Sequence, residues 1–259
     1  PYFNSTIIPI MTPALIIMGI GTILSWEKVD SKKNMQQIIT SMLFTILIIL
    51  IFFLFYRAFN ILGFVGIALG SWIICNVFVK IFINVKKENN KIMVSPVKFM
   101  KHFSSMIIAH LGVGLLILGI TGSSVWQKEN ITRMKVNDET TINNYNIVFK
   151  EIKELRGPNY ISLEGNFWVY NQEKKIITIL NPENRIYHIT NNTTTEVSIH
   201  TNLLRDLYIV LGEGNLNDGW IVRIYYNPLV IWIWIGVLII VMGGLLALNN
   251  NLKIIRHNN

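Results

Sequence analysis

One histidine inside an apolar segment is the residue of this sequence best suited to chemistry. His110 lies within the uncharged window Phe103–Gly122, and an ionisable group at membrane depth is costly and indicates a function. Its imidazole is able to bind a metal ion or haem iron, or to hydrogen-bond a neighbouring helix carbonyl. Gly112 and Gly114 follow it. Because they remove side-chain bulk, they favour close approach by a partner helix or a flat ligand.

No other histidine of this chain is placed to share an iron with His110. His102 lies eight residues earlier, so the two are separated by about 12 Å along a helix. His188 and His200 belong to a long polar stretch, and His257 belongs to the C-terminal tail. If His110 is one axial ligand, we therefore expect the other to come from a different chain or a missing segment.

The remaining candidates for chemistry are weak. Gly212-Glu213-Gly214 has the glycine spacing of a phosphate loop, but no helix follows it, so we expect a plain turn. Cys75 is the single cysteine, which excludes a disulfide, a CxxC redox pair and a zinc cluster within this chain. Scattered acids that could act as a base are more simply solvated or paired surface groups; they are Glu164, Glu183, Glu196 and Asp206.

Five windows without a charged residue predict the helices that position His110. The 259 residues are 51% hydrophobic and 15% charged, against about 25% charged in a soluble domain. Each window approaches the length of about 20 residues that crosses a bilayer, which excludes a cytosolic enzyme. The windows are Ile7–Leu24, Ile38–Tyr56, Ile61–Val79, Phe103–Gly122 and Leu229–Leu248.

The placement of positive charge predicts the topology. The net charge is +8, but residues 123–228 hold 11 Lys/Arg and 12 Asp/Glu, so the excess lies in the membrane part. There, only Arg57 falls between the second and third windows, and the other 11 basic residues fall on the opposite side. Since basic loops resist translocation, we expect the N-terminus and residues 123–228 outside and the C-terminus inside. Nucleic-acid binding is disfavoured, because it needs basic residues on the folded domain.

Residues 123–228 predict a small all-β extramembrane domain before the last helix. Short runs alternate apolar and polar residues between turn-forming clusters, and Trp168, Tyr187 and Trp220 are candidate core residues. The expected organisation is a four-helix transmembrane region at 1–122, the β domain at 123–228, and the last helix with an inner tail at 229–259. The expected strands are Tyr145–Phe149, Ile161–Tyr170, Ile176–Leu180, Arg185–Ile189, Val197–Ile199, Leu207–Leu211 and Trp220–Tyr226.

Several motifs occur in a fixed order along most of the chain. They are Pro9 to Trp26, Ala109-His110-Leu111-Gly112, Gly157-Pro158-Asn159-Tyr160, Pro182-Glu183-Asn184-Arg185-Ile186-Tyr187, Thr195-Glu196-Val197, Asp206 to Gly212, Arg223 and Asn227 to Gly236. In this order the chain resembles the C-terminal part of the cytochrome c maturation haem-lyase component, the CcmF family. Each motif is weak alone, and the order together with the placement makes the match specific.

The resemblance implies a function that the residues alone do not supply. CcmF-like proteins take haem from a membrane-tethered haem chaperone and join its vinyl groups to the CxxCH thiols of apocytochrome c. They also hold a haem b between two transmembrane histidines, which is taken to keep the substrate haem iron reduced. His110 matches the second of these histidines, so the resemblance implies that it is an axial ligand of the haem b iron.

The chain also departs from the family's pattern, because it lacks the tryptophan-rich WWD region, the flanking outside histidines and the first transmembrane haem ligand. The resemblance therefore implies a split-gene version, in which a separate N-terminal haem-lyase polypeptide carries these parts and this chain alone is inactive, with no catalytic residue assigned. It implies a mitochondrial inner membrane or bacterial plasma membrane location, with the β domain in the intermembrane space or periplasm. The alternative is a non-catalytic accessory subunit of a respiratory complex, whose β domain docks partners.

Overall fold

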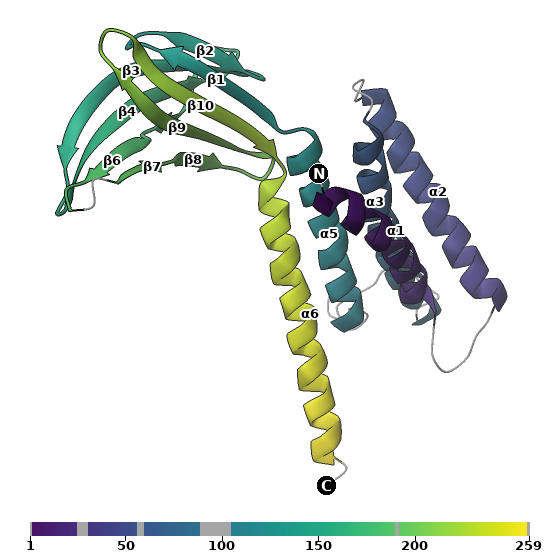
Figure 1. The fold of residues 1–259 in the computed structure, drawn as a ribbon. Coiled ribbons are helices and arrows are strands. Elements are labelled where there is room, and N and C mark those ends of the chain that lie inside the picture. Colours follow the sequence, from purple (N-terminus) through teal and green to yellow (C-terminus); the bar gives the residue numbers. More distant parts are fainter. Residues whose placement is uncertain (1, 25–30, 56–59, 89–104, 190–191, 258–259) are drawn as a thin grey trace. The chain divides into compact units, whose positions relative to one another are not determined.

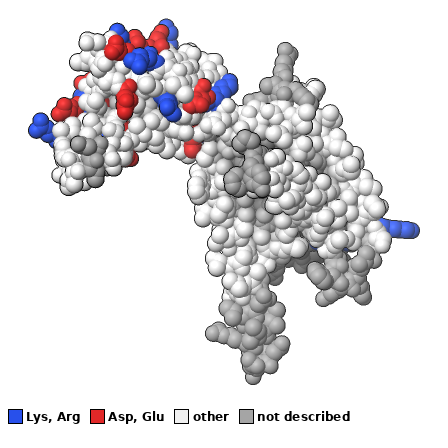
Figure 2. All heavy atoms as spheres, in the orientation of Figure 1, with Lys and Arg blue, Asp and Glu red and all other residues white. Residues whose placement is uncertain are grey.

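A computed structural model describes residues 2–24, 31–55, 60–88, 105–189 and 192–257. The chain divides into two compact units: residues 1–121 with 232–259 form a helical unit, and residues 122–231 form a β unit. In Figure 2, the charged side chains of the described residues on the visible face gather on the β unit, and few are seen on the described part of the helical unit. This contrast matches the division between uncharged windows and a polar stretch.

Five helices of the described residues are long and apolar enough to cross a membrane, which confirms the predicted membrane architecture (Figure 1). Helix α1 contains two prolines. Each helix includes most of one long uncharged run, as a membrane span requires. The helices are α1 (Tyr2–Ile23), α2 (Ser31–Phe55), α3 (Ile61–Glu88), α5 (Ser105–Val125) and α6 (Val230–His257).

Helix α3 packs against both α1 and α2. The Asn60 side chain accepts a hydrogen bond from the Gly63 backbone N–H at 3.2 Å, which caps the α3 N-terminus. Near that end, the rings of Phe52 and Phe64 meet edge to face at 5.8 Å. On the other side, the Trp72 indole donates to the Ile16 carbonyl of α1 at 3.1 Å. Helix α3 therefore holds α1 and α2 together.

The β unit consists of two antiparallel sheets. One has the strand order β1-β10-β9-β8, and the other has the order β2-β3-β4-β6-β7, with β5 also paired to β4. The strands are β1 (Lys128–Met134), β2 (Glu139–Ile142), β3 (Tyr145–Arg156), β4 (Tyr160–Tyr170), β5 (Ile176–Leu180), β6 (Glu183–Tyr187), β7 (Thr193–Glu196), β8 (Ser198–Thr201), β9 (Arg205–Asn215) and β10 (Gly219–Pro228).

The core of the β unit lies between the two sheets. Phe149 and Phe167 stack at 4.5 Å, and Trp220 meets Phe149 edge to face at 5.9 Å. The predicted core residue Trp220 is buried, but the prediction was wrong for Trp168 and Tyr187, which lie outside the buried cluster. Each strand alternates its two faces, and these two rings belong to the half-buried set, not to the buried set.

Three strands and one turn differ from the sequence prediction. Strands β1, β2 and β7 were not expected, because their residues are mostly exposed and polar; pairing with β10, β3 and β6 supplies their order. The prediction of a turn at Gly212-Glu213-Gly214 was wrong, since these residues continue β9 as far as Asn215. The turn follows at residues 216–218.

Candidate functional site

Helix α5, which carries His110, makes close backbone contact with α6. A Cβ atom on Gly112 would lie 2.6 Å from the Gly236 carbonyl oxygen, and one on Gly119 would lie 2.7 Å from the Ile233 nitrogen. Near the other end of α5, a Cβ on Gly243 would lie 2.7 Å from the Ala109 nitrogen. Glycines on both helices therefore let the two backbones touch over several turns.

A second face of α5 packs against α3. Ile107 is buried in a cluster with Val77 and Ile81, and Leu111 packs against the same cluster. One turn further along, a Cβ on Gly114 would lie 3.2 Å from the Gly70 carbonyl oxygen. Gly112 therefore allows close contact with α6, and Gly114 allows close contact with α3. This is the close helix approach that the two glycines favoured in the sequence.

Helical periodicity separates His110 from the positions of α5 that contact α3 and α6. At 3.6 residues per turn, Ile107, Leu111 and Gly114 form the α3 face, and Gly112 and Gly119 form the α6 face. His110 falls outside both groups, and its side chain is partly exposed within the unit. A group from outside the described helices is therefore able to approach the imidazole.

The hydrogen bond of His110 selects one nitrogen for chemistry. Its Nδ1 lies 2.7 Å from the Met106 carbonyl oxygen, one turn earlier in the same helix. A carbonyl only accepts, so this bond assigns the proton to Nδ1 and leaves the Nε2 lone pair available. A backbone carbonyl on the second nitrogen is the usual way in which a metal-binding imidazole is oriented. The donor chemistry and the open side both fit an axial iron ligand.

The second ligand is not found among the described residues. His102 lies outside them, and so does the side chain of His257. His188 and His200 belong to the β unit. The described residues contain no group of three or more His, Cys, Asp or Glu that could hold a metal ion. Within the described part of the chain, the candidate site is therefore the Nε2 atom of His110 alone.

A buried arginine in the β unit was missed by the sequence analysis. Arg205 is 2% exposed, and its guanidinium donates to the Tyr145 hydroxyl at 3.0 Å and to the His200 carbonyl at 3.0 Å. It also meets His200 Nδ1 at 2.8 Å, so that nitrogen is the acceptor. Burial and the Arg205 charge lower the pKa of His200. The Arg205 guanidinium thus bonds with groups of the same cluster, which indicates a structural role. A sequence signal for its burial existed, because Arg205 falls in phase with the inward residues Leu207 and Ile209.

The scattered acids of the β unit include a paired group. Arg185 donates to Glu183 at 2.9 Å and lies 3.7 Å from a Glu196 oxygen. The hydrogen bond from Arg185 lowers the pKa of Glu183. The guanidinium also lies 4.6 Å from the centre of the Tyr160 ring. Glu183 and Glu196 are therefore members of an ion-pair network, which is the structural role weighed for them above.

Comparison with known proteins shows which family the chain resembles. Residues 125–228 match the family model described as the CcmF C-terminal beta-sandwich. The chain is 30% identical over 249 residues to the cytochrome c-type biogenesis protein CcmF of Escherichia coli, a match that covers 96% of this chain and 37% of that protein. The CcmF of Pseudomonas aeruginosa is 29% identical, with 95% and 37% covered. The expected resemblance to the C-terminal part of CcmF is confirmed.

The fold is also similar to that of a solved structure, a cytochrome c heme lyase CcmF. The TM-score is 0.72 at 15% sequence identity, and the similarity covers 95% of this chain and 40% of that one. This comparison supports five apolar helices with a β domain before the last. The chain spans 37% of the length of the two relatives above.

Proposed function

Because nearly the whole chain aligns with the C-terminal part of CcmF proteins, we propose that it is a subunit of the cytochrome c haem lyase. It works with a separate N-terminal haem-lyase polypeptide that carries the WWD region. Together they receive haem from a haem chaperone and attach it to the CxxCH thiols of apocytochrome c. This chain supplies half of a membrane haem b site.

The bond between His110 Nδ1 and the Met106 carbonyl is the observation that carries the haem proposal. It fixes the ring by one bond and directs the Nε2 lone pair away from the helix backbone. The uncovered side of α5 leaves room for the partner polypeptide to bring the second histidine. When bound, haem b supplies an electron that keeps the iron of the substrate haem ferrous.

The residues around His110 act by positioning. The glycine contacts hold α5 against α6 at backbone distance, and the cluster with Val77 and Ile81 holds it against α3. Two fixed neighbours restrict rotation of α5 about its axis, so the face that carries His110 stays open.

The orientation belongs to the same proposal. The chain is a multi-pass membrane protein whose described helices include five candidate spans. From the positive-inside distribution, we place the β unit in the intermembrane space or periplasm and the C-terminus in the matrix or cytoplasm. The β unit would then lie on the side of the membrane where apocytochrome c receives haem. The choice between a mitochondrial inner membrane and a bacterial plasma membrane follows from the source of the partner polypeptide.

The proposal is tested by the spectrum of the purified complex. We expect co-expression of this chain with the N-terminal polypeptide to give a low-spin haem b spectrum of the bis-histidine type. His110→Ala should abolish or perturb the spectrum, because one axial ligand is lost. His188→Ala, at an exposed position of the β unit, should leave it unchanged. Copurification of the two chains is measured in parallel, and an unaltered spectrum in His110→Ala contradicts the proposal.

A further inference from the structure

The outward face of the sheet β1-β10-β9-β8 is distinct from its core face. In β9, alternate residues from Leu207 to Leu211 are fully buried between the sheets, so Tyr208 and Val210 lie on the opposite face. The register pairs Tyr208 with Tyr225 and Val210 with Arg223 on β10. The two tyrosine rings stack at 4.6 Å. This face therefore carries aromatic and apolar groups around an arginine.

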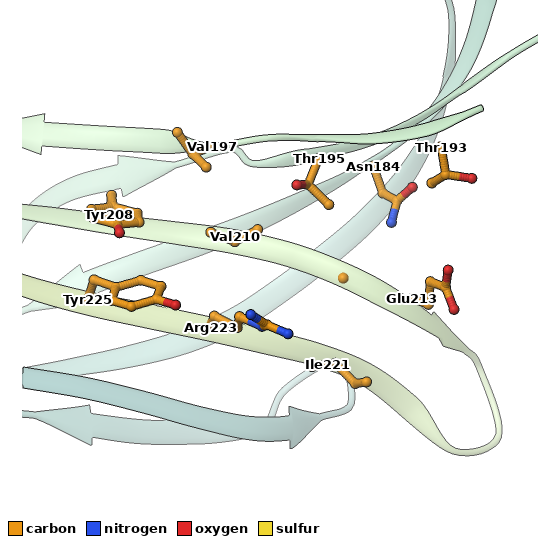
Figure 3. A pocket seen from close by; sticks show the side chains of 11 residues that line it. Asn184, Thr193, Thr195, Val197, Tyr208, Val210, Glu213, Ile221, Arg223 and Tyr225 are labelled. Atoms are coloured by element: carbon orange, nitrogen blue, oxygen red, sulfur yellow. The ribbon is translucent and has the colours of Figure 1, made fainter. Parts of the chain in front are cut away.

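A groove of about 660 Å³ lies on this face. Its floor includes Val210, Ile221 and Arg223, and its wall includes Thr195 and Val197 (Figure 3). The floor is hollow at Gly212, which contributes no side chain. Strands β9 and β10 supply the floor, and the β7 strand with the residue after it supplies the wall. The whole groove belongs to the β unit.

The groove opens where the chain of β7 and β8 passes from the edge of β9 to β6. Strand β8 pairs with β9 from Asp206 to Ile209, and the chain on its N-terminal side, β7, pairs instead with β6. Among the described strands, residues 210–215 of β9 are paired with β10 on one side and with no strand on the other, although β6 and β7 lie near β9. Such an edge offers backbone N–H and C=O groups to an added strand.

Arg223 gives the groove its charge. Its side chain is exposed, and no carboxylate of the described residues lies within 4.0 Å of it. It does hydrogen-bond the Tyr225 hydroxyl, whose pKa is raised mainly by a hydrogen bond with the Glu129 carboxylate. Glu213 stands apart at the far end of the groove (Figure 3). A cation beside apolar residues is thus left for a ligand.

We propose that this groove binds an extended polypeptide segment of a partner protein, in which an acidic side chain lies among apolar ones. The segment adds to the free edge of β9, its carboxylate pairs with Arg223, and its apolar side chains contact Val197, Val210 and Ile221. Tyrosine and arginine are among the residue types most enriched where partners bind strongly. The site does not depend on haem ligation by His110.

The free strand edge selects a peptide over a lipid headgroup. An anionic headgroup would satisfy Arg223 alone, whereas an extended peptide also satisfies the backbone groups of residues 210–215. Because side chains alternate along a strand, the residues two positions before and two positions after the acid lie on the same face as the acid. When the acid points toward Arg223, these two residues point toward the groove as well. The proposal therefore specifies an apolar residue two positions before the acid and another two positions after it.

The test uses the full chain in nanodiscs and a short fluorescein-labelled peptide that alternates serine and valine around one central glutamate. A twin peptide carries glutamine instead. From the strength of hydrogen bonds to charged groups, the glutamate peptide should bind about tenfold more tightly in fluorescence polarisation. Arg223→Gln should remove this preference. Arg156→Gln, at an exposed arginine outside the groove, is the matched control and should keep it.

A second pair of variants tests the groove itself. Thr195→Trp fills the wall side of the groove and should abolish binding of both peptides. Thr194→Trp places the same ring on the opposite face of β7, where it should have no effect. Equal binding of the two peptides, no binding of either, or loss of the preference in Arg156→Gln would overturn the proposal. So would phosphatidylglycerol vesicles that bind through Arg223 while the peptides do not.

Discussion

Replacing Gly112 by alanine tests the backbone contact that holds α5 against α6. The added Cβ would lie 2.6 Å from the Gly236 carbonyl oxygen, whereas ordinary Cβ contacts begin at 3.4 Å. The obstacle is backbone, so the two helices must separate by about 0.8 Å. A gap of that size removes about a quarter to a half of the dispersion attraction between facing atoms. Overpacking of this kind costs about 1–3 kcal/mol.

Gly244→Ala is the matched control, because a Cβ at that position of α6 meets nothing within 4 Å. Both substitutions gain about 1 kcal/mol of helix propensity, and this gain cancels in the comparison. The free energy of unfolding of the full chain in micelles is measured by SDS titration with circular dichroism. We expect Gly112→Ala to be less stable than Gly244→Ala by about 1–3 kcal/mol. Equal stability would refute the packing of α5 against α6.

Three further predictions concern the β unit of the full chain and are measured by hydrogen exchange of β9 and its neighbours. Arg205→Gln should destabilise the unit by about 2–3 kcal/mol, because the Tyr145 hydroxyl and His200 lose a charged partner; unchanged exchange would contradict the buried cluster. Because the pKa of His200 lies below its ordinary value of 6.5, the unfolded chain binds more protons, and stability should fall as the pH drops below that value. Because Arg185 lowers the pKa of Glu183 below 4.5, its stabilisation should disappear as the pH falls through the lowered value, and Glu183→Gln should lose this part of the acid dependence.

The helices were predictable because the signal for a membrane span is local. An uncharged run such as Phe103–Gly122 is long enough by itself, and α5 occupies Ser105–Val125. Strands with alternating burial, such as β9, were predictable for the same reason. Strand β1 was not, since Lys128–Met134 shows little apolar alternation and gains its order from pairing with β10. Gly212 and Gly214 indicated a turn, whereas pairing of this part of β9 with β10 holds the chain extended.

The candidate site was predictable as a residue but not as an arrangement. The cost of an ionisable group in an apolar window identified His110 from the sequence. Its partner atom, the Met106 carbonyl, depends on the rotamer of the ring, and the open side of α5 depends on which faces α3 and α6 occupy. The groove beside Arg223 could not be predicted from the sequence either. It forms only where the chain passes from β7, which pairs with β6, to β8, which pairs with β9.

The central claim, that His110 Nε2 binds haem iron, is tested most directly by chemical rescue. His110→Gly removes the imidazole from the co-expressed complex, and free imidazole is then added to the purified protein. We expect the low-spin haem b spectrum to be lost in the variant and restored by imidazole. A variant that keeps the low-spin spectrum without added imidazole would contradict the account.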